Sequence, residues 1–188
     1  MTEPAGAAPE THLSPALAEL LGDLPTDRRA HVLDLGPAVG SNIAFFGGRF
    51  LCSVEVVDLF GSFDGSVRRS VAADGDPTDL ALLWDGLNYL DRDQIRELAA
   101  LLAERCPPGA GVFAMVATNP EMPREPGTYP IRWDGSKAEL LYRGNRQATR
   151  PAPRYRPAEI DQMFEGFRVD RNFLLRHGVQ EYLLVREG

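Results

Sequence analysis

The sequence predicts an α/β fold in which a parallel β-sheet lies between two layers of helices. Residues 32–40 read VLDLGPAVG, an apolar run followed by a glycine-rich turn; the helical stretch SNIAFF and a second apolar run, FLCSVEVVDLF, come next. Strand, turn, helix and strand in this order are typical of a right-handed parallel unit. The later run DLALLW has no polar and apolar alternation, as expected of a strand that helices cover on both faces.

The other elements follow along the chain. Residues 1–13 are rich in Ala, Pro, Glu and Thr and are expected to form a flexible tail. Ser14 before Pro15 is typical of a helix start, and PALAELLGDL then carries leucines at helical spacing. The sequence further predicts a helix in DRDQIRELAALLAERC, a strand in GVFAMVA, a helix in PAEIDQMFEG and two closing strands in residues 167–186.

Two segments depart from this regular pattern. Residues 61–78 are polar, glycine-rich and too short for both a helix and a strand, so we expect the third strand of the sheet to be shortened or absent. Residues 118–157 are rich in proline and contain a DG turn between two short aromatic-bearing runs, which predicts a β-hairpin insertion near residues 128–143. The sequence thus predicts one domain, residues 14–188, with an insertion at 118–157.

Composition limits the classes of function. With 188 residues, 44% of them hydrophobic, the chain suits a single core, and its net charge of −7 argues against nucleic acid or an anionic membrane as a partner. No run is apolar enough to span a membrane, and the acidic start differs from a signal peptide, so a cytoplasmic protein is expected. Cys52 and Cys106 lie far apart and have no histidine at ligand spacing, so no metal site is predicted.

The glycine turn itself indicates a ligand. An acid, Asp34, is followed by the pattern G-x-A-x-G, in which the glycines allow close approach of a ligand and the next helix directs N–H groups toward it. The dinucleotide fingerprint does not fit, because Ala38 takes the place of its second glycine and its third glycine is missing. No lysine follows Gly40, so the phosphate-loop pattern fails too. We therefore expect a ligand that is not a polyphosphate, which disfavours a nicotinamide-dependent oxidoreductase.

Asp58 ends the second strand, where open parallel sheets place an acid that accepts hydrogen bonds from the hydroxyls of a ribose. The alternative is an aspartate that only caps the following loop. Beside the glycine turn, the ribose interpretation is favoured.

Several stretches together resemble, in order and spacing, the motifs of class I S-adenosylmethionine-dependent methyltransferases. They are VLDLGPAVG, VEVVD, DLALLWDGLNYL, the helix that ends in PPG before GVFAMV, and the closing EGFRVDRNF and QEYLLV. The resemblance covers roughly residues 30–117 and 157–186. It implies a Rossmann-like, three-layer, mostly parallel sheet with an antiparallel C-terminal strand, and S-adenosylmethionine as the cofactor.

The resemblance also implies roles for residues. The amino-acid end of the cofactor would be lined by the first turn, at Asp34, Gly36, Pro37, Ala38 and Gly40. Asp58 and Leu59 would lie at the ribose, and Trp84 and Asp85 would face the methionine portion and the methyl group. Trp84 could instead be a core aromatic residue, and Asp85 an N-cap for residues 86–90.

The adenine-contacting acid that such a sheet places after its third strand would be Asp74 or Asp76, within the shortened segment.

The acceptor is not identified by sequence. The insertion is expected to supply a lid and acceptor pocket, and the candidate acceptor-binding residues are Asn88, Trp133, Tyr142 and Arg154. The arginines of residues 143–156 could bind a phosphate or carboxylate, or pair with acids of the protein's own surface. If the acceptor must lose a proton, Asp85 and Tyr89 are the candidate catalytic bases. No histidine is assigned, because no acid partner can be placed beside one.

These observations predict methyl transfer from S-adenosylmethionine to a small molecule. The alternative is a non-catalytic S-adenosylmethionine-binding, nucleotide-binding or regulatory module, because a shortened segment 61–78 would remove part of the adenine wall. A homodimer could form if the hairpin edge pairs with a second copy.

Overall fold

The computed structural model describes residues 10–61, 67, 71 and 75–188. Its central sheet has six strands, namely β2 (Ala30–Asp34), β3 (Cys52–Val56), β4 (Leu80–Trp84), β5 (Gly111–Ala117), β10 (Phe167–Leu175) and β11 (Val179–Arg186). They lie in the order β10-β11-β5-β4-β2-β3. The strands β3, β2, β4 and β5 are parallel, whereas β11 runs antiparallel to both β5 and β10. The prediction of a mostly parallel sheet with an antiparallel C-terminal strand is confirmed.

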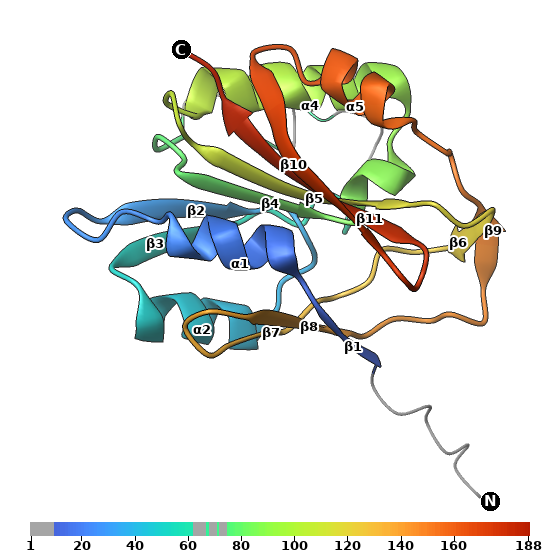
Figure 1. Ribbon diagram of the computed structural model, residues 1–188, viewed down its shortest axis with the longest axis horizontal. Helices are drawn as coiled ribbons and strands as arrows, with labels where there is room; N and C mark the ends of the chain where they lie inside the picture. Colours follow the sequence, from blue (N-terminus) through green and yellow to red (C-terminus); the bar gives the residue numbers. More distant parts are fainter. Residues whose placement is uncertain (1–9, 62–66, 68–70, 72–74) are drawn as a thin grey trace, which may run out of the picture.

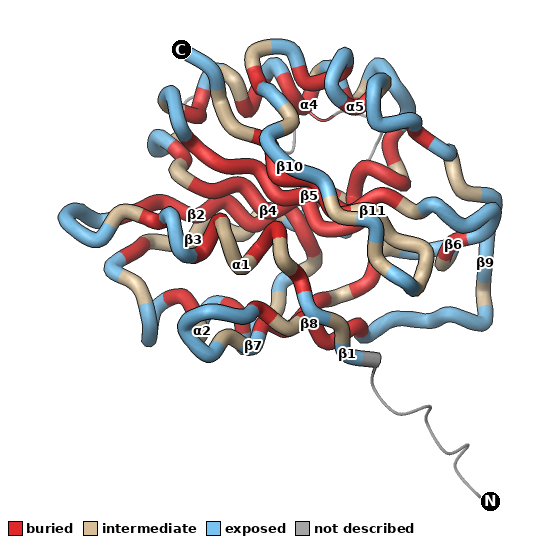
Figure 2. The backbone as a smooth tube through the Cα atoms, viewed as in Figure 1, coloured by how far each residue is buried: buried red, intermediate tan, exposed pale blue. Residues whose placement is uncertain are grey.

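Helices cover both faces of the sheet, which confirms the three-layer prediction (Figure 1). The four α-helices whose bounds are described are α1 (Pro15–Gly22), α2 (Gly40–Arg49), α4 (Arg92–Arg105) and α5 (Pro157–Met163). Leu33 and Leu83 belong to one buried cluster with α4 and α5, while Val32 and Leu82 belong to the other with α1 and α2. Both β2 and β4 are buried at every position, and Figure 2 shows this buried centre. Their continuous apolar sequence follows from burial on both faces.

Local sequence explains the helix ends. The Ser14 hydroxyl accepts a hydrogen bond from the Leu17 N–H at 3.3 Å, as predicted for the start of α1. Asp91 and Gln94 form a reciprocal capping box at the start of α4. Helix α2 extends beyond the predicted helical stretch SNIAFF, through Gly47 and Gly48, and ends at Arg49. The buried Phe46 side chain fixes this last turn in the core.

The prediction of a flexible tail at residues 1–13 is wrong for residues 10–13. Glu10–Leu13 forms strand β1, which pairs antiparallel with β8 (Ala138–Tyr142). The reason is a long-range partner: β8 has an open edge, and backbone N–H and C=O groups at such an edge pair with any strand brought beside it. Residues 1–9 lie outside the described part of the chain.

The predicted hairpin insertion is confirmed. Strands β7 (Ile131–Trp133) and β8 pair antiparallel around Asp134 and Gly135, and β1 extends them into a three-stranded sheet. Asp134 accepts hydrogen bonds from the N–H groups of Ser136 and Lys137, both at 2.8 Å, and Gly135 has a φ of 104° that favours glycine. A second small antiparallel pair joins β6 (Glu121–Pro123), before the hairpin, to β9 (Thr149–Pro151), after it.

The segment that was expected to lack a full third strand is only partly described. Residues 61, 67, 71 and 75–78 form no strand, and among the described strands β3 ends the sheet on that side. The other residues of the segment, including the adenine candidate Asp74, lie outside the described residues. Asp76 is exposed, and its backbone carbonyl accepts hydrogen bonds from Arg105 and Thr78. In the described residues, no helix combines the length and apolar character needed to cross a membrane.

Candidate functional site

The carboxyl ends of β2, β3 and β4 meet at one edge of the sheet, where open parallel sheets bind ligands. Asp34 ends β2 and is 2% exposed. Its Oδ1 atom accepts hydrogen bonds from the Gly36 N–H at 3.0 Å and from the Trp84 indole Nε1 at 2.6 Å. Burial raises the pKa of this carboxyl to about 6. Asp34 therefore joins the glycine turn to the end of β4.

Trp84 lies directly on this turn. An added Cβ at Gly36 would be 2.4 Å from Cδ1 of the indole, so the indole occupies the space that only a glycine leaves free. The indole stacks on Tyr129 with ring centroids 5.6 Å apart. Trp84 has a φ of 51°, at a point where the pairing of β4 with β5 shifts register. This left-handed conformation, which is unfavourable by about 1–3 kcal/mol for a non-glycine residue, aims the side chain at the turn.

The outer part of the turn is open. Ala38 and Gly40 are exposed and Pro37 is partly exposed. Helix α2 begins here with Val39 as its N-cap residue, and within the described chain no side chain caps it. The first N–H groups of α2 are thus available to a ligand.

Asp58 stands at the same edge and is exposed. Its Oδ1 atom accepts hydrogen bonds from the N–H groups of Phe60 at 3.1 Å and Gly61 at 2.8 Å, so it does cap the loop that follows. Because the residue is exposed, loop capping and ligand contact are compatible. The neighbouring Leu59 is 2% exposed and packs in the core cluster with α4.

Asp85 follows Trp84 but borders a different space. Its Oδ2 atom accepts hydrogen bonds from the Gly127 N–H at 3.1 Å and the Tyr129 hydroxyl at 2.9 Å. Burial raises the pKa of this carboxyl to about 6. Although it precedes the short 3-10 helix η1 (Gly86–Tyr89), its side chain makes no capping bond there among the described contacts. The side chain is therefore held by the insertion, not by the helix.

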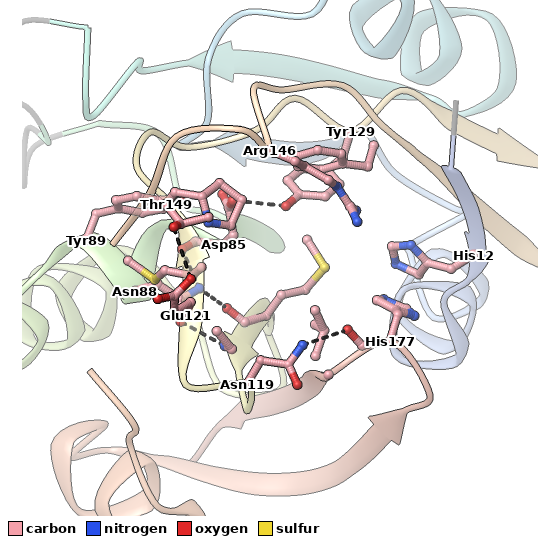
Figure 3. Close-up of a pocket in the computed structure, with 17 residues that line it drawn as sticks. His12, Asp85, Asn88, Tyr89, Asn119, Glu121, Tyr129, Arg146, Thr149 and His177 are labelled. Carbon is pink, nitrogen blue, oxygen red and sulfur yellow. Dashed lines mark hydrogen bonds between the residues drawn. The ribbon is translucent and has the colours of Figure 1, made fainter. Parts of the chain in front are cut away.

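A cavity of about 220 Å³ lies at the carboxyl ends of β4 and β5, beneath the insertion (Figure 3). Its polar end includes Asp85, and its walls include Tyr89, Tyr129, Tyr142, Met115 and Met122. This volume is below the range of roughly 300–1,000 Å³ that is usual for drug-sized ligands. The cavity therefore suits a small molecule with apolar or aromatic parts.

Two predicted site residues in η1, Asn88 and Tyr89, make hydrogen bonds to the backbone. The Asn88 Nδ2 atom donates to the carbonyls of Asp85 and Met115, and its Oδ1 atom accepts from the Ala117 N–H. Its side chain thus connects the ends of β4 and β5. The Tyr89 hydroxyl lies within donating distance of the backbone carbonyls of Pro123 at 3.0 Å and Glu125 at 2.8 Å, and burial raises its pKa above the usual range.

A phenol with a raised pKa that donates to carbonyls is a poor proton acceptor. Tyr89 lines the cavity but is not retained as a base.

The other acceptor candidates lie in different places. Tyr142 lines the cavity, and the guanidinium of Arg146 lies over its ring, 4.3 Å from the centroid. Trp133 stacks on Phe50 with centroids 5.2 Å apart, outside the set of residues that line the cavity. Arg154 is exposed and is likewise not among the lining residues. Of the five arginines in residues 143–156, all of them described, Arg146 is the one that lines the cavity.

Sequence reasoning missed a histidine cluster. His12 of β1 and His177 of the β10–β11 turn both line the cavity, with ring centroids 4.5 Å apart. Glu181 of β11 lies behind them, fully buried, with its Oε1 atom 3.8 Å from His12 Nε2. Burial, followed by the nearby His177 and Arg146, lowers the pKa of His12 to about 4, whereas burial raises the pKa of Glu181 to about 7. The available signal was an acid, Glu181, directly before the apolar run YLLV in a predicted strand.

Comparisons with known proteins agree with this geometry. A family described as a methyltransferase domain matches residues 10–169, and the chain belongs to that family. A search of curated protein sequences gives no match.

Solved structures with the same fold include the 1,6-didemethyltoxoflavin-N1-methyltransferase of Burkholderia thailandensis, bound to 1,6-didemethyltoxoflavin and S-adenosylhomocysteine. It shares 18% identity at a TM-score of 0.55, over 93% of this chain and 77% of that chain. An S-adenosylmethionine-bound amino pentose methyltransferase of Micromonospora echinaspora shares 17% identity at a TM-score of 0.54, over 90% and 88% of the two chains. A magnesium protoporphyrin IX methyltransferase of Synechocystis with bound S-adenosylmethionine shares 16% identity at a TM-score of 0.53, over 92% of this chain and 76% of that chain.

The glycine turn and Asp58 fit such a cofactor on their open side. Ala38, Gly40 and Asp58 are exposed, so the uncapped start of α2 can offer N–H donors, and Asp58 a carboxylate acceptor, to a ligand. The Trp84 indole covers Gly36, so a ligand can contact that glycine only after the indole turns away.

Proposed function

We propose that this protein transfers the methyl group of S-adenosylmethionine to a small molecule held in the cavity. The observation that carries this proposal is the arrangement of two consecutive residues at the end of β4. The indole of Trp84 lies on the glycine turn, and the carboxyl of Asp85 borders the cavity. A ligand on the turn and a ligand in the cavity would therefore meet at this point.

S-adenosylmethionine would be held by the outer glycine turn and by Asp58, and when bound it supplies a methyl group to a nucleophilic atom. The task of the chain is to orient the acceptor, and orientation alone can lower the barrier of a two-reactant step by about 7–11 kcal/mol. The aromatic walls of the cavity limit the positions of a small acceptor and exclude water.

Asp85 is the proposed proton acceptor. With a pKa of about 6 it is mostly ionised at neutral pH, yet more basic than an ordinary aspartate, which is the range in which a general base works well. The N–H of Gly127 and the hydroxyl of Tyr129 hold its Oδ2 atom, so the carboxylate keeps one orientation. It accepts the proton from the N–H or O–H group that is methylated.

Calorimetric titration with S-adenosylmethionine tests the cofactor. Saturable binding is expected, and Asp58→Ala should weaken it, whereas Asp93→Ala on the exposed face of α4 should not. Absence of binding at millimolar concentrations would refute the proposal. Transfer is then measured with labelled cofactor and a metabolite extract.

Tryptophan fluorescence provides a second readout. The chain has two tryptophans, so Trp133→Phe leaves Trp84 as the only source of tryptophan emission. The emission of Trp84 should change on cofactor binding, because its indole now lies on Gly36.

A second candidate function is a non-catalytic binding or regulatory module. The indole over Gly36 and the lack of a strand in the described residues of segment 61–78 favour it. Cofactor binding without labelled methyl in any compound of the extract would support this function over the first.

A further inference from the structure

We propose that the methyl acceptor is a small carboxylate-bearing molecule, whose acid group is bound by Arg146, His12 and His177 at one end of the cavity. The N–H or O–H group that becomes methylated then faces Asp85 at the other end. This inference rests on the proposed function and adds to it the chemical class of the acceptor.

The basic end is assembled from three segments that are distant in sequence. His12 comes from β1, His177 from the β10–β11 turn and Arg146 from the insertion, and all three line the cavity. Figure 3 shows His12 and His177 together on one side, with the Arg146 guanidinium directed toward them. Both His177 and Arg146 act on His12 strongly enough to lower its pKa, which places the three basic groups within electrostatic reach of one another. Such a group of donors matches an anion.

The opposite end is acidic. Asp85 and Glu121 lie across the cavity from the histidines in Figure 3, and the Glu121 carboxylate accepts a hydrogen bond from the Thr149 hydroxyl at 3.1 Å. Between the two ends, the rings of Tyr129 and Tyr142 form a wall, with centroids 5.5 Å apart. The cavity is thus polar at both ends with opposite sign and aromatic between them. A flat molecule with an acid at one end and an amine or hydroxyl at the other satisfies all three regions.

The Nε2 atom of His12 could make a hydrogen bond to a bound anion. This atom is buried and has no hydrogen-bond partner within the described part of the chain, and the same holds for Glu181 Oε1, 3.8 Å away. In the free protein His12 is neutral at pH 7. A carboxylate beside it favours the imidazolium form, because an opposite charge nearby stabilises the charged state. Of the groups that face His12, Glu181 is acidic, whereas His177 and Arg146 are basic.

Binding of a carboxylate should therefore be coupled to protonation of His12. The affinity should rise as the pH falls toward the range in which His12 is protonated while the carboxylate of the ligand remains ionised.

The test uses matched probes without cofactor: 4-aminobenzoate, benzoate and 4-methylaniline, titrated by NMR. Both carboxylates should bind, and 4-methylaniline should bind roughly tenfold more weakly or worse, as expected from the loss of charge-assisted hydrogen bonds. Arg146→Gln should weaken the carboxylates by a similar factor. Arg143→Gln is the matched control, because Arg143 is exposed in the same segment and does not line the cavity. Benzoate should raise the pH at which the His12 imidazole signal titrates.

Three results would each overturn the inference: equal binding of 4-methylaniline and benzoate, unchanged benzoate binding by Arg146→Gln, or an unmoved His12 titration. Since no cofactor is present, these outcomes are independent of the proposed function. Cofactor binding and methyl transfer without carboxylate preference would refute this inference alone. Carboxylate binding without any binding of S-adenosylmethionine would instead refute the proposed function.

Discussion

Replacing Glu181 by glutamine should stabilise the protein, and only above the pH at which the glutamate ionises. The side chain is fully buried, and burial raises its pKa from 4.5 to about 7. The folded state therefore holds the proton more tightly than the unfolded state does. Protonated Glu181 therefore contributes to the free energy of unfolding. This contribution is complete below about pH 4.5 and is lost as the pH rises through about 7. A shift of that size corresponds to about 3 kcal/mol.

Glutamine has the same shape, keeps an oxygen that can accept the Ala16 N–H bond, and cannot ionise. Urea unfolding of Glu181→Gln and of the parent protein, near pH 5 and near pH 8, measures the effect. The advantage of the variant should be about 2 kcal/mol larger near pH 8 than near pH 5. Glu187→Gln, at an exposed position, should show no such difference. An advantage for Glu181→Gln that is equal at both pH values, or a loss at both, would refute the reasoning.

Three further predictions follow from single contacts. Asp85→Asn should lower kcat/KM by about 10²–10⁴-fold and remove the rise in activity near pH 6, measured as a pH–rate profile; a profile that keeps this rise would exclude Asp85 as the base. Gly36→Ala should lower the free energy of unfolding by about 1–3 kcal/mol in urea titrations, because the new methyl group meets Trp84; Trp84→Phe in the same chain should recover part of the loss. Ser14→Ala should lower it by about 1 kcal/mol in the same assay through loss of the α1 cap, and an unchanged midpoint would contradict that role.

Features encoded by neighbouring residues were predictable from sequence. The continuous apolar runs of β2 and β4, the capping box of α4 and the DG turn of the hairpin each depend on residues within a few positions of one another. The same holds for Asp34, which ends β2, whereas β3 ends at Val56, two residues before the predicted strand end at Asp58. Because parallel strands bring their carboxyl ends to one edge, local sequence was sufficient to locate that edge.

The contacts that sequence could not provide join distant segments. His12 lies in a polar stretch that has no strand pattern of its own, and it becomes ordered because β8 offers an edge to β1. Its proximity to Glu181 follows from that pairing and has no counterpart in spacing along the chain. The direction of the Trp84 side chain depends on the positive φ of this residue and on the register shift beside it. No residue pattern predicts either feature.

Several energetically unfavourable residues lie near the edge of the sheet at which the parallel strands end. Asp34, Asp85 and Glu181 are carboxyls whose ionised forms burial disfavours, and Trp84 has a backbone conformation that is unfavourable for its residue type. Packing alone does not require them, since an apolar or neutral side chain of similar size would fill the same space without the electrostatic penalty. Of these three carboxyls Asp85 lines the cavity, and a perturbed carboxyl in a cleft is common at sites that move protons or bind polar ligands. Their concentration here favours an active enzyme over a binding module that has only the fold.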